Sequence, residues 1–323
     1  MLIDILKIAA GLVALVYAAD RLVKSAVRIS RAFDVSVVLI GAVVVGFGTS
    51  VPEFVVSALA ALEGNLDLAV SNVISSNTTN VTLVLGSAAL LWPLAARRRI
   101  VRREGALMFA SVVGLTAMLA GGSLNLWEGF VLLGLLGVAV WLMIRWSADD
   151  PAAVLAQIED ADVPVEDGES EDLASWRRLV GTEMVVAVVA LVVTVIAADF
   201  LLDGVIGVGV RFGFSAVVLG LITGVGTSLP ELAAGISGAR RHEPGLVLGN
   251  VLGSNIFNSL GVVGIAAILG PGRLYEITPI LVAIMVGSAL VAGFFAFTGQ
   301  RINRFEGAIL MAGFVAYATY AFI

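Results

Sequence analysis

Long apolar segments, separated by short polar ones, run along the whole chain of 323 residues. A helix needs about 20 predominantly apolar residues to cross a bilayer, and segments of that length predict ten spans. The first contains Lys7 and continues past Ala19, so we interpret it as a membrane helix and not as a cleaved signal peptide. The predicted spans lie at 5–30, 36–60, 67–92, 104–121, 125–145, 180–204, 214–239, 245–270, 276–298 and 305–322.

The basic residues predict how these spans are oriented, because Lys and Arg accumulate in cytoplasmic loops. With ten spans, alternate loops receive fifteen of the nineteen Lys and Arg, including the five arginines within 97–103. The opposite side receives only Lys7, Arg211 and Arg273, and Arg21 lies within the first span. We therefore expect both termini to lie outside and the central loop to lie in the cytoplasm.

Composition supports a polytopic membrane protein. The chain is 59% hydrophobic and 14% charged, with a mean hydropathy of +1.03, which is typical of a protein whose solvent is mostly lipid. It has no cysteine, which excludes disulfides, thiol nucleophiles and thiolate metal sites. We expect the lipid bilayer as its surroundings and no prosthetic group, nucleic acid or obligatory protein partner. Compact loops and no transit-like leader fit a prokaryotic inner membrane.

The central loop is strongly acidic. Residues 149–172 hold ten Asp and Glu and no basic residue. The run "IEDADVPVEDGESED" has too few apolar groups to fold by itself. We interpret 147–178 as a cytoplasmic linker between two domains, 1–146 and 179–323. Calcium sensing is an alternative role, but the ligand spacing and central glycine of an EF-hand loop are missing.

The two sides of this linker are copies of each other. The string "YAADRLVKSA" from Tyr17 is repeated as "IAADFLLDGV" from Ile196, and "GTSVPE" from Gly48 as "GTSLPE" from Gly226. Each copy holds five spans, and because five is odd, the second copy enters the membrane from the opposite side. The predicted fold is therefore an all-α membrane protein with ten transmembrane helices in two inverted five-helix repeats. Transporters built this way bind their substrates near the midplane between the halves.

Each copy places one glutamate just after a helix break. The Gly-Thr-Ser strings predict that helices 2 and 7 are broken, and Ser-x-x-Glu with proline in the first turn fits a capping box at Glu53 and Glu231. Capping alone does not account for the charge, since glutamine would cap as well and a carboxylate near the bilayer centre is costly. Carboxylate, hydroxyl and exposed carbonyl oxygens together suit a hard cation such as Ca²⁺ or Na⁺. We therefore favour a cation site over capping alone.

A second pair of strings supports the same interpretation. In "SNVISSNTTNVTLVLG" from Ser71 and "GNVLGSNIFNSLGVVG" from Gly249, a serine precedes an asparagine by four residues. Residues four apart share a helix face, so each pair can present two oxygens to one point. The pairs interpreted as ligands are Ser76 with Asn80 and Ser254 with Asn258. We assign interhelical hydrogen bonding to Asn72, Asn77, Asn250 and Asn255.

The paired G-T-S-[VL]-P-E and S-N-x-x-N strings resemble the α-repeats of the cation/Ca²⁺ exchanger superfamily. The chain is similar to the prokaryotic sodium/calcium exchangers over essentially its whole length. The resemblance implies Ca²⁺ and Na⁺ as transported substrates, cation sites at the midplane and alternating access by sliding of the first and sixth helices. It also implies backbone carbonyl ligands at Gly46 and Gly224. By motif position, the implied side-chain ligands are Thr49, Ser50, Glu53, Ser76 and Asn80 from one repeat and Thr227, Ser228, Glu231, Ser254 and Asn258 from the other.

One position departs from the family pattern. Several members have Asp where this chain has Asn258. The two remaining carboxylates neutralise one Ca²⁺ but leave one positive charge uncompensated when three Na⁺ bind. Exchange of three Na⁺ for one Ca²⁺, which would be electrogenic, and independence of potassium are therefore expectations from the resemblance alone.

The same residues permit other functions and roles. A Ca²⁺/H⁺ antiporter could use Glu53 and Glu231 to carry protons. An intramembrane enzyme with Ser50 or Ser228 as nucleophile needs a base, and the single histidine, His242, falls in a loop at the membrane surface, so we expect no enzymatic activity. A passive channel is disfavoured because inverted broken repeats predict coupled exchange. We expect structural roles for Asp20 and Asp199, which recur at corresponding places in the two copies.

Overall fold

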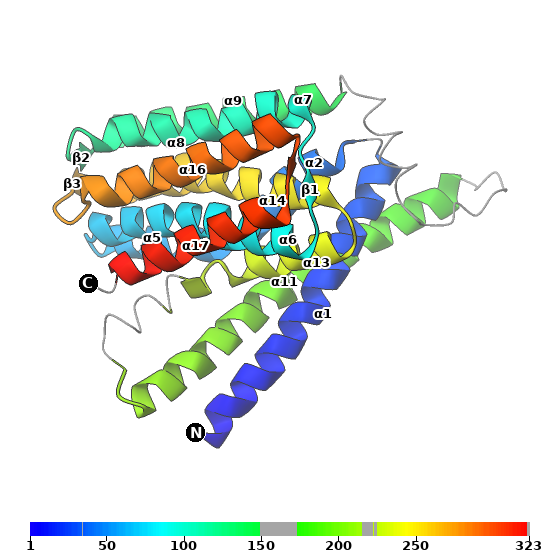
Figure 1. Cartoon of the computed structure of the whole chain (residues 1–323), viewed down its shortest axis with the longest axis horizontal. Coiled ribbons are helices and arrows are strands. Elements are labelled where there is room, and N and C mark those ends of the chain that lie inside the picture. Colours follow the sequence, from blue (N-terminus) through cyan, green and yellow to red (C-terminus); the bar gives the residue numbers. More distant parts are fainter. Residues whose placement is uncertain (34, 149–172, 215–221, 223–224, 322–323) are drawn as a thin grey trace.

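The structure is a computed structural model that describes residues 1–33, 35–148, 173–214, 222 and 225–321 (Figure 1). The first half contains α1 (Leu2–Ala32), α2 (Val37–Ile40), η1 (Gly41–Gly46), α3 (Phe47–Thr49), α4 (Val51–Leu62), α5 (Leu66–Thr79), η2 (Asn80–Val84), α6 (Leu85–Leu91), β1 (Leu94–Ala95), α7 (Arg98–Ile100), η3 (Val101–Gly105), α8 (Ala106–Leu119), β2 (Ser123–Leu124) and α9 (Leu126–Ala148). The second contains α11 (Leu173–Arg211), α13 (Leu229–Arg240), α14 (Pro244–Ile256), η4 (Phe257–Val262), α15 (Val263–Leu269), β3 (Gly272–Arg273), α16 (Pro279–Gly299), β4 (Arg301–Ile302) and α17 (Arg304–Ala321). The η elements are π-helical segments that continue the helices beside them.

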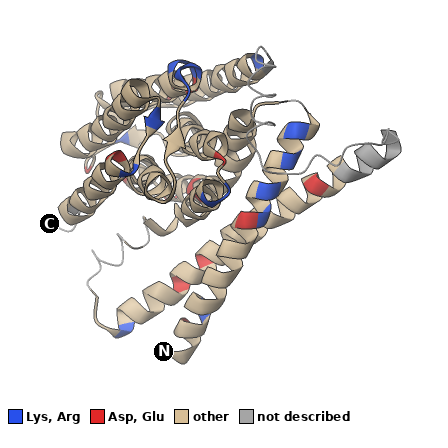
Figure 2. Cartoon of the chain, turned by 45° about the vertical axis from the view of Figure 1, so that its right-hand side comes forward, with Lys and Arg blue, Asp and Glu red and all other residues tan. Residues whose placement is uncertain are grey.

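The helices have the length and surface of membrane helices. Among the described residues, five are long and apolar enough to cross a bilayer, and Val37–Thr49 with Val51–Leu62 forms a further span bent by 44°. Each of the ten predicted spans contains described helix, whereas the count of ten transmembrane helices stays a prediction. Charged residues lie mostly at helix ends and on α1 and α11 (Figure 2). The chain is an integral membrane protein.

Helix extends into both ends of the range predicted as linker. α9 continues to Ala148 and α11 begins at Leu173, so the helical hydrogen-bonding pattern continues beyond the apolar limits of the predicted spans. The acidic residues 149–172 lie outside the described residues. The linker and its orientation therefore remain predictions.

α1 and α11 form an antiparallel pair that crosses the other helices at an angle (Figure 1). A Cβ added at Gly11 would lie 2.8 Å from the backbone nitrogen of Leu201, so the two backbones are in contact. Small residues permit such close packing between membrane helices. Ion pairs join the helices towards both ends, where Asp4 binds Arg211 and Glu183 binds Arg28. These contacts make α1 and α11 a unit.

Equivalent connections lie at opposite ends of the molecule (Figure 1). β1 pairs with β4 at one end, and β2 pairs with β3 at the other. β3 follows β1 by 178 residues and β4 follows β2 by the same interval, so the two ribbons are repeat equivalents. The N-termini of α9 and α17 also carry matching caps, in which Glu128 accepts from Asn125 N and Glu306 accepts from Asn303 N, each at 2.8 Å. This arrangement is expected of inverted repeats.

The two halves touch through backbone where η1 crosses α14. Four glycines lie at this crossing: Gly41 and Gly46 on η1 and Gly249 and Gly253 on α14. A Cβ added at Gly46 would lie 2.9 Å from Ser254 N, closer than such atoms approach in folded proteins. Only glycine therefore permits this separation of the two helices.

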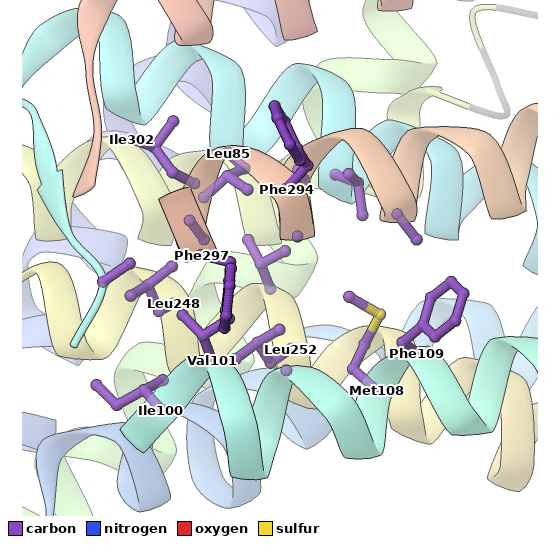
Figure 3. A pocket seen from close by; sticks show the side chains of 18 of the residues that line it. Leu85, Ile100, Val101, Met108, Phe109, Leu248, Leu252, Phe294, Phe297 and Ile302 are labelled. Atoms are coloured by element: carbon purple, nitrogen blue, oxygen red, sulfur yellow. The ribbon is translucent and has the colours of Figure 1, made fainter. Parts of the chain in front are cut away.

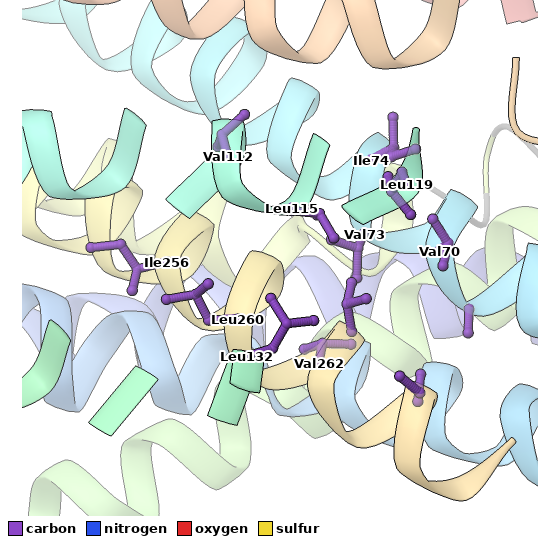
Figure 4. Close-up of a cluster of buried hydrophobic side chains, with 14 of the residues drawn as sticks. Val70, Val73, Ile74, Val112, Leu115, Leu119, Leu132, Ile256, Leu260 and Val262 are labelled. Carbon is purple, nitrogen blue, oxygen red and sulfur yellow. The ribbon is translucent and has the colours of Figure 1, made fainter. Parts of the chain in front are cut away.

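A large apolar core lies beside this crossing, where α5, α8, α9 and η4 meet (Figure 4). Its buried side chains include Val70, Val73, Ile74, Val112, Leu115, Leu119, Leu132, Leu260 and Val262. Because α5 and η4 come from different repeats, burial of this cluster holds the halves together. It also holds the polar faces of the same two helices in place.

The glycine crossing gives a first prediction. We expect Gly253→Ala to destabilise the protein by about 1–3 kcal/mol, because the added methyl group would overlap the backbone of Ala42. The check is the midpoint of thermal unfolding of the purified protein in detergent. Gly134→Ala on α9 is the control, since nothing lies within 4 Å of the Cβ it adds. Equal midpoints for the two variants would contradict the proposed role of the crossing.

Candidate cation-binding site

The predicted helix break is present in the first repeat. α3 ends at Thr49, Ser50 has φ −82° and ψ 5°, and α4 begins at Val51. In the second repeat Ser228 has nearly the same conformation, φ −88° and ψ 8°, and α13 begins at the next residue. The two breaks are therefore locally alike.

The expected capping boxes do not form. Neither Ser50 nor Ser228 accepts a side-chain hydrogen bond from its own helix. The backbone N–H that a capping glutamate would bind donates instead to a carbonyl of the preceding turn, Gly46 O for Ser50 at 3.2 Å and Val225 O for Ser228 at 3.1 Å. Capping therefore does not use the carboxylate of either Glu53 or Glu231.

The breaks bring the two glutamates together instead. Glu53 and Glu231 are both fully buried, and they lie close enough for their charges to interact. The hydroxyl of Ser50 donates to Glu231 Oε1 at 3.2 Å, which joins the first repeat to the second. Thr49 and Ser254 also lie beside Glu231, while Ser76 and Ser228 lie beside Glu53. Each carboxylate is thus surrounded by hydroxyl groups from both repeats.

Asn80 and Asn258 sit where the helices change geometry. Asn80 begins η2, and Asn258 is the second residue of η4. Both side chains are completely buried. π-Helical segments within α-helices are rare and are frequent at functional sites. The sequence did not predict these segments.

Many buried oxygen atoms at this place have no protein partner. An unpaired buried polar atom costs free energy, more so when it is charged. Within the described residues, the side-chain atoms without a hydrogen bond include both carboxylate oxygens of Glu53, one of Glu231, the hydroxyls of Ser76 and Ser228, and the amide groups of Asn80 and Asn258. Such an oxygen-rich set suits a hard cation.

The other asparagines use their amide nitrogens within the protein. Those of Asn72 and Asn77 donate to serine hydroxyls, at 3.1 and 2.8 Å. Those of Asn250 and Asn255 donate to backbone carbonyls, at 3.2 and 2.8 Å. The Asn255 bond lies within α14, and the carbonyl oxygens of Asn77 and Asn255 have no hydrogen-bond partner, as in Asn80 and Asn258. The division of the six asparagines into structural residues and ligands therefore stays a prediction.

The remaining predicted ligands are placed as follows. The Gly46 carbonyl accepts from Ser254 Oγ at 3.1 Å, so it lies at the contact between the repeats. Thr227 is buried next to Ser228. Gly224 lies outside the described residues. Eleven of the twelve predicted residues are thus described, and their roles as ligands remain to be tested.

His242 does not serve this site. Its ring stacks on Trp92 with centroids 3.8 Å apart, and it lies beyond the C-terminus of α13. The helix separates it from Ser228 by about 18 Å, since each residue adds about 1.5 Å. Among the described residues, no cluster of three or more His, Asp and Glu could hold a metal ion. The chemistry of this place is therefore that of neutral oxygens around two carboxylates.

Comparison with known proteins identifies relatives along the whole chain. A family model described as sodium/calcium exchanger protein matches residues 4–145 and 182–323. Inner membrane protein YrbG of Escherichia coli is 33% identical over 95% of this chain and 93% of its own length. Sodium/calcium exchanger MaX1 of Methanosarcina acetivorans is 29% identical over 97% and 96%. Among solved structures, the sodium-calcium exchanger NCX_Mj is similar with a TM-score of 0.81, at 26% identity over 98% of this chain and 97% of that one.

The carboxylates generate the second prediction. We expect Glu53→Gln and Glu231→Gln each to weaken Ca²⁺ binding by about tenfold or more, because contacts to a charged group contribute about 1.5–3 kcal/mol. Calorimetric titration of the purified protein with Ca²⁺ measures this. Glu63→Gln, an exposed carboxylate at the end of the same helix as Glu53, is the control. If either site variant binds Ca²⁺ as tightly as the control while remaining folded, that glutamate is not a ligand.

Proposed function

Since the chain belongs to the sodium/calcium exchanger protein family, we propose that Na⁺ is the ion that it exchanges for Ca²⁺ by alternating access. Cation/Ca²⁺ exchange follows from the family, so the protein is a transporter and not an enzyme. The observation that supports a shared site is the meeting of Glu53 and Glu231 from opposite repeats within one set of buried oxygens.

Na⁺ coupling is supported by the neutral groups around the two glutamates. Hydroxyl, amide and carbonyl oxygens can replace the hydration shell of Na⁺, whereas a proton needs only a carboxylate. Two relatives, MaX1 and NCX_Mj, also carry the name of sodium/calcium exchangers. The alternative is Ca²⁺/H⁺ antiport, in which Glu53 and Glu231 would carry the protons.

Asn258 leaves the site with two carboxylates, whereas the charge that crosses in each cycle depends on the stoichiometry alone. Two carboxylates balance one Ca²⁺, and three Na⁺ would carry one positive charge more than the site neutralises. Exchange of three Na⁺ for one Ca²⁺ would move one net charge whatever the fixed charge of the site, and a membrane potential would contribute about 2.3 kcal/mol per 100 mV to that movement. We propose this electrogenic cycle for the protein.

The orientation in the membrane is proposed from the distribution of Lys and Arg. Both termini would lie outside, and the acidic segment and the arginines of 97–103 would lie in the cytoplasm. A bacterial inner membrane agrees with the name of the relative YrbG.

Access to the site would change as the α1 and α11 pair moves. A cleft of about 780 Å³ lies between α1, α11 and α13. At one end of it Asp20 accepts from both Nε and Nη2 of Arg241, at 2.7 and 2.5 Å, and from Ser237 at 3.2 Å. The equivalent Asp199 is exposed on α11. In the described conformation, these hydrogen bonds therefore hold α1 against α13 at the end of the cleft that we assign to the cytoplasm.

The proposed coupling is tested by radioactive Ca²⁺ uptake into proteoliposomes loaded with Na⁺ and diluted into Na⁺-free medium at equal pH. We expect uptake only with the outward Na⁺ gradient, and an inside-positive potential should accelerate it if three Na⁺ leave for each Ca²⁺. A parallel set receives a proton gradient alone. Uptake driven by protons and indifferent to Na⁺ would replace this proposal with the Ca²⁺/H⁺ alternative.

The Asp20 contact gives a separate prediction. Because the chain has no cysteine, Ala233→Cys introduces a single thiol into the cleft between α1 and α13. We expect Asp20→Asn to accelerate the reaction of this thiol with a maleimide by up to about fivefold. The reason is that a half-exposed ion pair contributes up to about 1 kcal/mol to the stability of the described conformation. Asp199→Asn in the same background is the control. Equal rates in the two variants would show that the contact does not hold this conformation.

A further inference from the structure

An apolar cavity of about 380 Å³ lies away from the cation site, between η3, α8, α14 and α16 (Figure 3). Every residue that lines it is apolar or glycine, including Val101, Met108, Leu248, Leu252, Gly293 and Phe297. The cavity lies within the usual volume range of small-molecule pockets. Its lining excludes ions and polar solutes and suits a hydrocarbon group.

The cavity is open to the bilayer and has the depth of one leaflet. Leu290 and Phe294 on its rim are 52% and 63% exposed on the outer face of α16. Along η3 and α8 it extends from Ile100 to Phe109 (Figure 3). Nine helical residues rise about 14 Å, which is close to half of the hydrocarbon core of about 30 Å. A lipid acyl chain in one leaflet has this reach.

Arginines lie next to one end of the apolar cavity. Ile100 and Val101, at that end, belong to a segment that contains five arginines within 97–103. Arg98 and Arg102 are exposed and lie four residues apart, so they project from neighbouring turns. Arg103, by contrast, packs on the Trp146 ring. Guanidinium groups bind phosphate well, and the cytoplasmic leaflet is rich in anionic lipid.

We propose that this face binds one anionic glycerophospholipid, with an acyl chain in the cavity and its phosphate on Arg98 and Arg102. Charge complementarity selects the headgroup, and the dry cavity selects the chain. The bound chain would pack on Val81 and Val251, which share helices with Asn80 and Ser254. The lipid would thus brace two helices of the cation site without entering it, and the proposal does not depend on the transported ion.

The test is native mass spectrometry of the full chain purified in detergent. The probes are palmitoyl-oleoyl phosphatidylglycerol, phosphatidylcholine with the same chains, and soluble glycerol phosphate. We expect one phosphatidylglycerol to be retained with about tenfold higher affinity than phosphatidylcholine, given two arginines near the surface, and no retained glycerol phosphate. Binding of glycerol phosphate alone would reduce the site to a phosphate site, and equal binding of the two lipids would overturn the headgroup assignment.

Two glycines on α16 provide a matched pair of variants. Gly293 lines the cavity and Gly287 does not, and nothing lies within 4 Å of a Cβ added at either. We expect Gly293→Phe to fill the cavity and abolish retention of phosphatidylglycerol, and Gly287→Phe to leave it unchanged. Retention by Gly293→Phe would show that the acyl chain lies elsewhere.

The arginines are tested against others on the same side of the predicted topology. We expect Arg98→Gln with Arg102→Gln to bring phosphatidylglycerol binding to the level of phosphatidylcholine. Arg31→Gln with Arg240→Gln removes the same charge from α1 and α13, which contribute no residue to the cavity, and should preserve the preference. An equal loss in both double variants would indicate attraction to basic surface in general and would overturn the site.

Discussion

Backbone contact between η1 and α14 is the constraint on which the candidate site depends. Since no side chain separates these segments at their glycines, Ser254 reaches the Gly46 carbonyl at 3.1 Å. The Ser50 hydroxyl likewise reaches Glu231 at 3.2 Å. Oxygens from both repeats therefore share one small volume, and neither repeat alone would provide both carboxylates. The apolar cluster of α5 and η4 holds the same arrangement from the other side.

The charge of the two buried carboxylates favours coupled exchange of cations over their passive flow. Two carboxylates in a medium of low dielectric constant are costly unless opposite charge accompanies them. A conformational change that carries the site from one side to the other is then easiest with cations bound, which disfavours an empty return. In the proposed cycle, the α1 and α11 pair, joined by its own ion pairs, is the unit that moves while the glycine crossing stays together.

Local features of this structure could be predicted from the sequence, and long-range ones could not. The apolar segments and doubled strings predicted helices, internal repeats and a break at Ser50, because each depends on neighbouring residues. The π-helical segments were missed because one additional residue in a turn leaves the polar pattern almost unchanged. The bonds of Ser50 with Glu231 and of Asp20 with Arg241 join residues 181 and 221 positions apart, so only packing reveals them. Candidate ligands were therefore found by motif, whereas their surroundings required the fold.

The constant spacing between the matching strands and helix caps indicates which sequence changes the two repeats tolerate. Gly48 and Gly226, β1 and β3, and the caps at Glu128 and Glu306 are all separated by the same 178 residues. Side chains between these points differ widely in the two copies, yet neither copy has a net insertion or deletion relative to the other. One added residue would rotate all that follows in a helix by about 100° and turn its oxygens away from the partner repeat. Between Gly48 and Glu128, divergence after duplication has therefore proceeded by substitution at constant length. The strings from Tyr17 and Ile196 are 179 residues apart, so a net difference of one residue lies ahead of the helix break.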